Sequence, residues 1–356
     1  MRPIPVPFLK SLSSLLLVLL VASPATSATA SPAAESRQPA VFRAESQVQL
    51  ELASGERVAP RLPAGAELAN AAALGDHGWV VTALDKREIV VRMNEGSRGA
   101  VAATLPALPD VFGGSLRREP LPLVEDGHLG GLVWLEGDGP RGLGVRFARW
   151  NGTGWEAPRT VAAPGPGSQL ALTAARLADG PWLLAWSAFD GHDDEIVWSR
   201  QAADGTWSAP RRVAADNSVP DVTPALTATA GGALLAWSRF DGTGYQVVTS
   251  RFRAGKWEEP RAAAPSGSLF PAFQPASSSG TGAGTAAYLL YQTAAPRGWA
   301  AVEVDGSGQT GAIAKIAKVA TASHDQPVVE ASPDRSGVTF RWPGTGEERA
   351  ASWVRP

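Results

Sequence analysis

A motif of about fifty residues recurs in the middle third of the chain. Each of its three clearest copies holds an apolar segment that ends in tryptophan, an Asp-Gly pair, an arginine and a second tryptophan three residues before Pro-Arg. The inner tryptophans are Trp134, Trp186 and Trp237, at spacings of 52 and 51 residues. A repeat of this length is typical of a β-propeller or a solenoid, in which each repeat is one supersecondary unit.

The second copy divides into four short strands, expected at residues 170–175, 182–187, 195–200 and 206–213. The segment 182–187 is almost entirely apolar, which favours a strand that is buried on both faces. Asp204-Gly205 lies between the third and fourth strands and is a hairpin signal. Pro210 lies in the fourth, and a proline cannot donate to a ladder, so that strand is expected at an outer edge.

Weaker copies cover residues 66–109 and 269–322, and a last copy begins near Gln326 and lacks its fourth strand. The segment 46–58 alternates like a strand and could supply the missing one. We therefore expect an all-β fold: a six-bladed β-propeller of four-stranded antiparallel blades over residues 46–356, closed by pairing of 46–58 with the strand at 350–354. Seven blades would need a further repeat within residues 31–65, and an open solenoid would need capping repeats.

Composition excludes several functions. The 356 residues include no cysteine, so disulfides and cysteine-based zinc sites are ruled out. The formal net charge is -2, which gives no basic field for a nucleic acid backbone.

The first thirty residues have the pattern of a signal peptide. Arg2 and Lys10 precede a twelve-residue apolar stretch at 11–22, too short to span a bilayer, and Ala28-Thr29-Ala30 offers a cleavage site. An uncleaved anchor is the alternative. We expect cleavage after residue 30, a flexible segment at 31–45, no membrane span in the mature protein, and a secreted or periplasmic monomer.

The hairpin Asp204-Gly205-Thr206-Trp207 resembles those of bacterial exported β-propellers related to sialidases and BNR-repeat proteins, over residues 118–265. In the sialidase Asp box one residue separates the aspartate from the glycine, whereas here they are adjacent. Phe42-Arg43 also departs from the sialidase N-terminal motif, and no Tyr–Glu pair can be named. We therefore assign no catalytic residue from this resemblance.

A second resemblance is to six-bladed fucose-binding lectins, which hold a sugar against an aromatic ring with arginine and glutamate. The residue types that carry it are Arg149, Arg200, Arg251 and the outer tryptophans Trp155, Trp207 and Trp257. The alternative is that the tryptophans are packing residues between neighbouring sheets.

Three aspartates follow the inner tryptophans by four residues and, with two neighbours, are the candidate ligand-binding residues: Asp138, Asp190, Asp241, His192 and Tyr245. The loop around Asp190 also carries Asp193, Asp194 and Glu195, so these four carboxylates are candidate ligands for Ca²⁺. The alternative is an Asp-Gly turn with solvated charge. We expect no other cofactor.

These patterns favour an exported binding module for glycans or for an envelope protein, rather than an enzyme. A carbohydrate-active hydrolase or lyase, with converging carboxylates at the central funnel, is the alternative. A structural interaction platform is the third possibility, and the fold alone does not decide between them.

Overall fold

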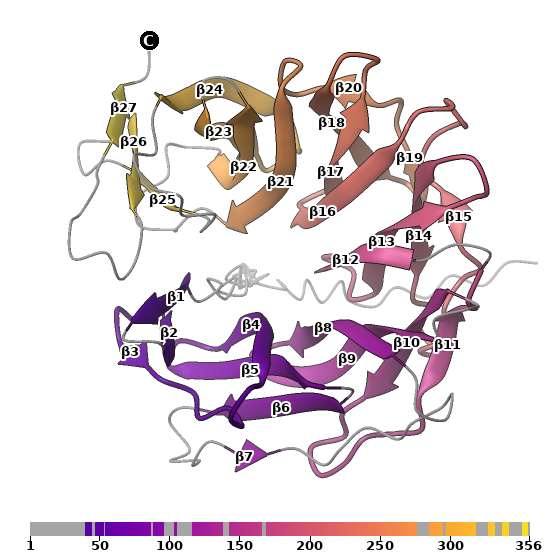
Figure 1. Ribbon diagram of the computed structural model, residues 1–356, viewed down its shortest axis with the longest axis vertical. Helices are drawn as coiled ribbons and strands as arrows, with labels where there is room; N and C mark the ends of the chain where they lie inside the picture. The colour runs from indigo at the N-terminus through magenta and orange to yellow at the C-terminus, as the bar shows by residue number, and fades with distance from the viewer. Residues whose placement is uncertain are drawn as a thin grey trace, which may run out of the picture. The chain divides into compact units, whose positions relative to one another are not determined.

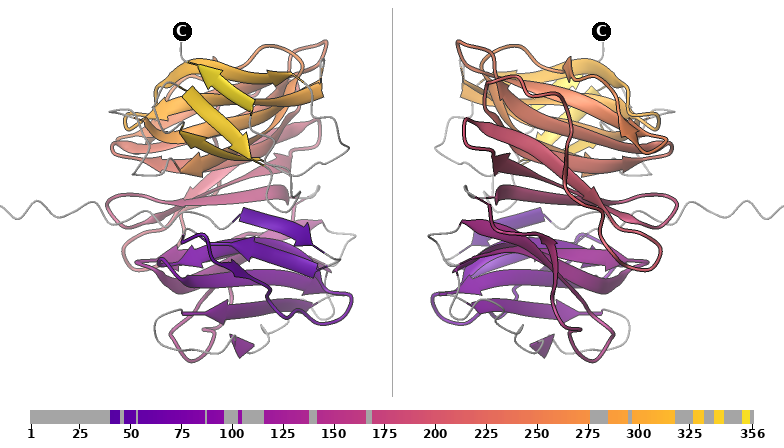
Figure 2. Two further views of the ribbon diagram at one scale, coloured as in Figure 1. Left: turned by 90° about the vertical axis from the view of Figure 1, so that its left-hand side faces the viewer. Right: turned by 90° about the vertical axis from the view of Figure 1, so that its right-hand side faces the viewer.

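The computed structural model describes residues 40–44, 47–52, 54–86, 88–95, 103–104, 116–137, 142–165, 169–275, 285–294, 297–317, 327–331, 337–341 and 351–354. All of its regular elements are β-strands, and they form antiparallel sheets in chain order (Figure 1). The expected all-β fold of four-stranded antiparallel sheets is confirmed, and it is the arrangement of a β-propeller. The sheets are twisted, as the side views in Figure 2 show.

Five sheets of four or more strands form the middle of the chain. The first comprises β4 (Glu67–Leu74), β5 (Gly78–Asp85), β6 (Glu88–Asn94) and β7 (Ala103–Thr104). The second comprises β8 (Leu116–Glu125), β9 (His128–Gly137), β10 (Leu143–Arg149) and β11 (Arg159–Ala162). The third comprises β12 (Gln169–Arg176), β13 (Trp182–Phe189), β14 (Asp194–Arg200) and β15 (Arg211–Arg212). The fourth comprises β16 (Asp221–Thr229), β17 (Gly232–Phe240), β18 (Tyr245–Arg253), β19 (Lys256–Trp257) and β20 (Arg261–Ala262). The fifth comprises β21 (Ser268–Pro275), β22 (Thr285–Ala294), β23 (Arg297–Asp305) and β24 (Thr310–Ala317).

A three-stranded sheet precedes these five and another follows them. The first has β1 (Ala40–Ala44), β2 (Gln47–Glu51) and β3 (Arg57–Val58), and the last has β25 (Val328–Ala331), β26 (Gly337–Arg341) and β27 (Ala351–Val354). The described residues therefore form seven sheets, where the repeat count predicted six blades. The prediction assumed that a blade needs about fifty residues, but three short strands fit between residues 40 and 58.

The expected closing ladder is also corrected. Both edges of β2 are occupied, by β1 and by β3, and β27 pairs with β26, so β2 does not pair with β27. The two end sheets meet instead through side chains: Nη2 of Arg341 lies 2.5 Å from Oε1 of Glu51. Ala40–Ala44, which was expected to be flexible, is the strand β1.

The core lies between consecutive sheets. Trp134 packs with Val80 and Leu132 between the first and second of the five middle sheets. Trp186 and Trp237 occupy the same place at the next two interfaces, and all three indole side chains are fully buried. The prediction that the inner tryptophans form the core is confirmed.

The fourth strand that was predicted at 206–213 is shorter in the structure. In the third sheet it is reduced to β15 and an isolated bridge between Gln201 and Trp207. Pro210 lies between these two pairings and has no N–H to donate, which interrupts the strand.

Candidate functional site

Two kinds of connection meet at one end of the middle sheets, which we call the loop end. At this end the second strand of a sheet finishes and the first strand begins, because Gln169 at the start of β12 pairs with Ala188 near the end of β13. The loop 190–193 joins β13 to β14 here, and the connection 213–220 leads from β15 to the start of β16. The loop end therefore collects segments that are far apart in the sequence.

The first strands of the middle sheets contact one another in chain order, from β4 through β8, β12 and β16 to β21. Each of the five has a register shift near its start at the loop end. In four of them the bulge holds a non-glycine residue with positive φ, near 50°: Glu119, Ala171, Thr223 and Phe270. Such strain is uncommon and is concentrated near functional sites. This row of bulges therefore makes the loop end a candidate functional site.

A buried polar residue stands at or next to the start of the same four strands. Asp221 of β16 forms a bidentate ion pair with Arg239 of β17, at 2.7 and 2.8 Å. Arg117 of β8 faces Glu136 of β9 with the charges reversed, at 3.3 Å. Gln169 of β12 accepts a hydrogen bond from Nε1 of Trp186, and Ser268 of β21 donates one to the carbonyl of Pro265. The first three pairs hold a first strand on its second strand, and the residue types differ from sheet to sheet.

Large apolar side chains are exposed beside the bulges. Leu170 of β12 is 42% exposed and Phe270 of β21 is 50% exposed. Phe189, the last residue of β13, is 37% exposed and begins the acidic loop. Three apolar side chains at one end of the sheets provide surface on which an apolar ligand face could pack.

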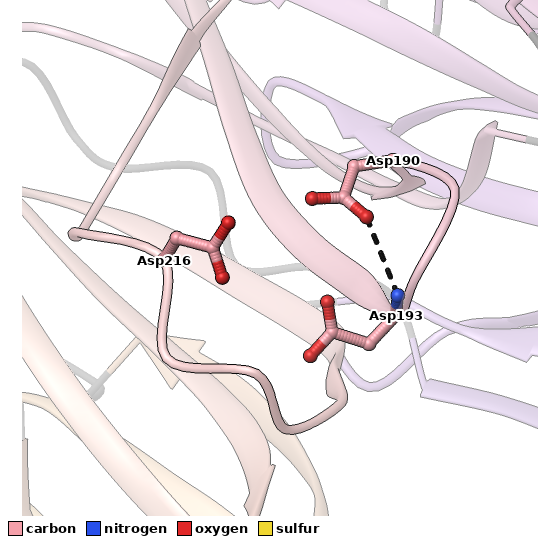
Figure 3. Close-up of side chains that lie close together, drawn as sticks. All are labelled: Asp190, Asp193 and Asp216. Atoms are coloured by element: carbon pink, nitrogen blue, oxygen red, sulfur yellow. Dashed lines mark hydrogen bonds between the residues drawn. The ribbon is translucent and has the colours of Figure 1, made fainter.

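Three carboxylates meet where the loop 190–193 approaches the connection 213–220. Asp190, Asp193 and Asp216 each offer an oxygen, and these atoms lie within 4.8 Å of one another (Figure 3). We call this group the aspartate cluster. Arg212 binds two of its members, Asp190 at 2.6 Å and Asp216 at 2.8 Å.

The pKa values of Asp190 and Asp193 are shifted in opposite directions. Backbone N–H groups of His192 and Asp193 donate to Oδ1 of Asp190, which lowers the pKa of Asp190. Burial and the neighbouring carboxylates raise the pKa of Asp193. Glu195 lies at the start of β14, and burial with the charge of Asp221 raises its pKa to about 7. Glu195 is only 2% exposed.

The structure brings some of the predicted residues together and not others. Asp190 and Asp193 share the cluster, whereas Asp194 and Glu195 are outside it, and Asp216 was not anticipated. Asp138 lies outside the described residues. Asp241 caps its own turn by accepting from the N–H groups of Thr243 and Gly244.

The two remaining candidates are His192 and Tyr245, which belong to different sheets. His192 is exposed at the tip of the acidic loop, and its backbone N–H is held by Asp190. Tyr245 begins β18 and packs edge-on against Phe240, with ring centroids 5.6 Å apart.

The lectin-like set of arginines and outer tryptophans has a structural explanation in the part of the chain that is described. Arg200 pairs with Asp179, Arg251 with Glu258 and Arg149 with Glu125. Trp207 packs against Phe147 and Trp257 against Trp198, each on the preceding sheet. Trp207 and Trp257 are therefore packing residues between sheets.

No family model matches this chain, and no curated protein matches it. Solved structures do. A protein of unknown function from Dyadobacter fermentans aligns with a TM-score of 0.52 at 13% identity, over 87% of this chain and 94% of its own. Puromycin hydrolase aligns with a TM-score of 0.54 at 15% identity, over 86% of this chain, which spans half of the hydrolase. The lectin BP39L from Burkholderia pseudomallei gives 0.51 at 14%, over 86% and 88%.

These neighbours are β-propeller-type proteins, and at this identity the likeness shows the fold alone. Within the described residues there is no helix long and apolar enough to cross a membrane.

Proposed function

We propose that this protein is an exported β-propeller that binds glycans through the loop end. The observation that carries the proposal is the exposed apolar group Leu170, Phe189 and Phe270, which lies at the same end as the strained bulges and the acidic loop. Sugars present apolar C–H faces that stack on such side chains, and their hydroxyl groups bond to carboxylates. The similarity in fold to the lectin BP39L is consistent with this proposal, but the proposal does not rest on it.

The test is a glycan array probed with the purified protein. We expect a defined set of glycans to bind, and Phe270→Ala and Leu170→Ala to weaken binding at least about tenfold, which is about 1.4 kcal/mol. Ile313→Ala is the control, because Ile313 is also a large exposed apolar residue, at 37%, but lies on β24. Equal losses in all three variants, or binding to no glycan, would contradict the proposal. If the protein captures an envelope protein, and the capture persists after periodate oxidation of the glycans, the partner would be a protein and not a glycan.

A carbohydrate-active hydrolase or lyase is the second candidate, and Glu195 is the observation that favours it. A carboxyl group with a pKa of about 7, close to Asp221, has the protonation expected of a general acid. A general acid must reach the leaving group, however, and Glu195 is buried. We therefore favour binding. If the protein releases a product from a bound glycan, and Glu195→Gln abolishes this release, the result would favour the enzyme.

We infer further that residues 1–30 are removed on export and that the mature chain is a monomer. We also infer that the two end sheets complete a closed ring, and that the protein belongs to the sialidase-like group of propellers. Mass spectrometry of the protein from its host should give Ser31 as the first residue. An intact Met1 in the extracytoplasmic fraction would indicate an uncleaved anchor. Light scattering should give the mass of one chain.

A further inference from the structure

One carboxylate of the aspartate cluster, that of Asp193, is in direct contact with no cation among the described residues. Asp193 is 8% exposed, and both of its carboxylate oxygens are buried without a hydrogen-bond partner among the described residues. Its carboxylate points towards Asp216 and lies beside Asp190 (Figure 3). A buried carboxylate without a partner is costly, so it must either hold a proton or face a cation.

Arg212 does not serve as that cation for Asp193. Its guanidinium donates to Oδ2 of Asp190 and to Oδ2 of Asp216, and no contact with Asp193 is formed. Three carboxylates and one guanidinium leave a formal charge of -3 + 1 = -2 on the cluster. The neighbouring Asp221 adds nothing to this sum because Arg239 pairs with it.

We propose that Asp190, Asp193 and Asp216 bind a divalent cation, with Ca²⁺ preferred over Mg²⁺. A charge of +2 balances the cluster, and all of the donors are carboxylate oxygens, the ligands of hard cations. Oxygens at about 2.4 Å from Ca²⁺ lie at most about 4.8 Å apart, whereas a Mg²⁺ shell is only about 4.1 Å across. The donor atoms of the cluster lie within 4.8 Å of one another, a limit that a Ca²⁺ shell reaches and a Mg²⁺ shell does not.

The loops are built so that the donors are held before the ion arrives. Oδ1 of Asp190 is fixed by two backbone N–H groups of its own turn, and Oδ1 of Asp216 accepts from the backbone N–H of Ser218. Arg212 fixes the other oxygen of each. A carboxylate oxygen can accept more than one bond, so these contacts leave lone pairs for a metal. The ion would join the acidic loop to the next connection, 213–220.

The test uses the whole purified protein after treatment with a chelator. Titration calorimetry with CaCl2 should show one site per chain, and the melting temperature should rise with Ca²⁺ by mass action and less with equal MgCl2. Asp193→Asn should weaken Ca²⁺ binding at least about tenfold, since affinity follows the number of ligand charges. If this variant does not fold, Asp216→Asn serves the same purpose on the exposed side of the cluster.

Asp241→Asn is the matched control. Asp241 holds the same place after Trp237 as Asp190 holds after Trp186, but it lies outside the cluster. Its variant should keep the full Ca²⁺ response. No heat on adding Ca²⁺ and no change in melting temperature would overturn the proposal, and Asp193 would then hold a proton. An unchanged response in Asp193→Asn would overturn it as well, because the ion would bind elsewhere.

Discussion

Trp186 shows at the scale of one residue what holds neighbouring sheets together. Its side chain is fully buried between the second and third middle sheets, and its indole N–H donates to Gln169. We expect Trp186→Ala to lower the free energy of unfolding by about 3–5 kcal/mol, through lost packing and the cavity that remains. Urea denaturation would measure it. A loss below about 1 kcal/mol would contradict the packing described for this interface.

Glu195 should make stability depend on pH. Its folded pKa of about 7 is above the ordinary value of 4.5, so between these values the folded state binds more protons than the unfolded chain. Stability from this group is therefore present at low pH and falls as pH rises from about 4.5 to about 7, by at most about 3 kcal/mol. Glu195→Gln should remove the fall. Denaturation of both proteins across this range, in chelator, is the measurement, and identical pH profiles would contradict it.

The bulges of the first strands are the clearest feature at the scale of the element. Ala171 lies in the left-handed region at φ 53°, which costs a non-glycine residue about 1–2 kcal/mol. Ala171→Gly should therefore leave stability unchanged or raise it by about 1 kcal/mol. Ala174→Gly, on the same strand in an ordinary strand conformation, should lower stability by about 0.5–1 kcal/mol. Equal losses on denaturation would show that the bulge is unstrained.

The sequence predicted the elements wherever a residue type recurs. Tryptophan at a constant spacing located the second strands, because each repeat buries the same large side chain against the preceding sheet. The bulges had no such signal, since Glu119, Ala171, Thr223 and Phe270 share a backbone conformation and no side-chain chemistry.

The aspartate cluster could be predicted only in part. Asp190 and Asp193 lie in one acidic loop, so their proximity follows from the sequence. Asp216 comes from the connection before the next sheet, and only the packing of the two segments brings it to them. Asp194 lies outside the cluster, because neighbouring residues of an extended segment point to opposite sides.

At the scale of the whole molecule, the first and last sheets meet at Glu51 and Arg341. Both side chains are largely buried, and Glu51 also binds Arg57 of its own sheet. We expect a double-mutant cycle with Glu51→Gln and Arg341→Met to give a coupling energy of about 1 kcal/mol. Thermal denaturation of the four proteins would provide it. Additive effects of the two substitutions would mean that this contact does not tie the end sheets.

The opposed polarity of two buried ion pairs has a consequence for a chain made of near-copies. In β8 and β9 the arginine precedes and the glutamate follows, whereas in β16 and β17 the aspartate precedes and the arginine follows. If β8 folded onto β17 by mistake, Arg117 would be buried against Arg239, and like charges out of water repel strongly. The opposed polarity therefore disfavours the exchange of strands between these two hairpins during folding.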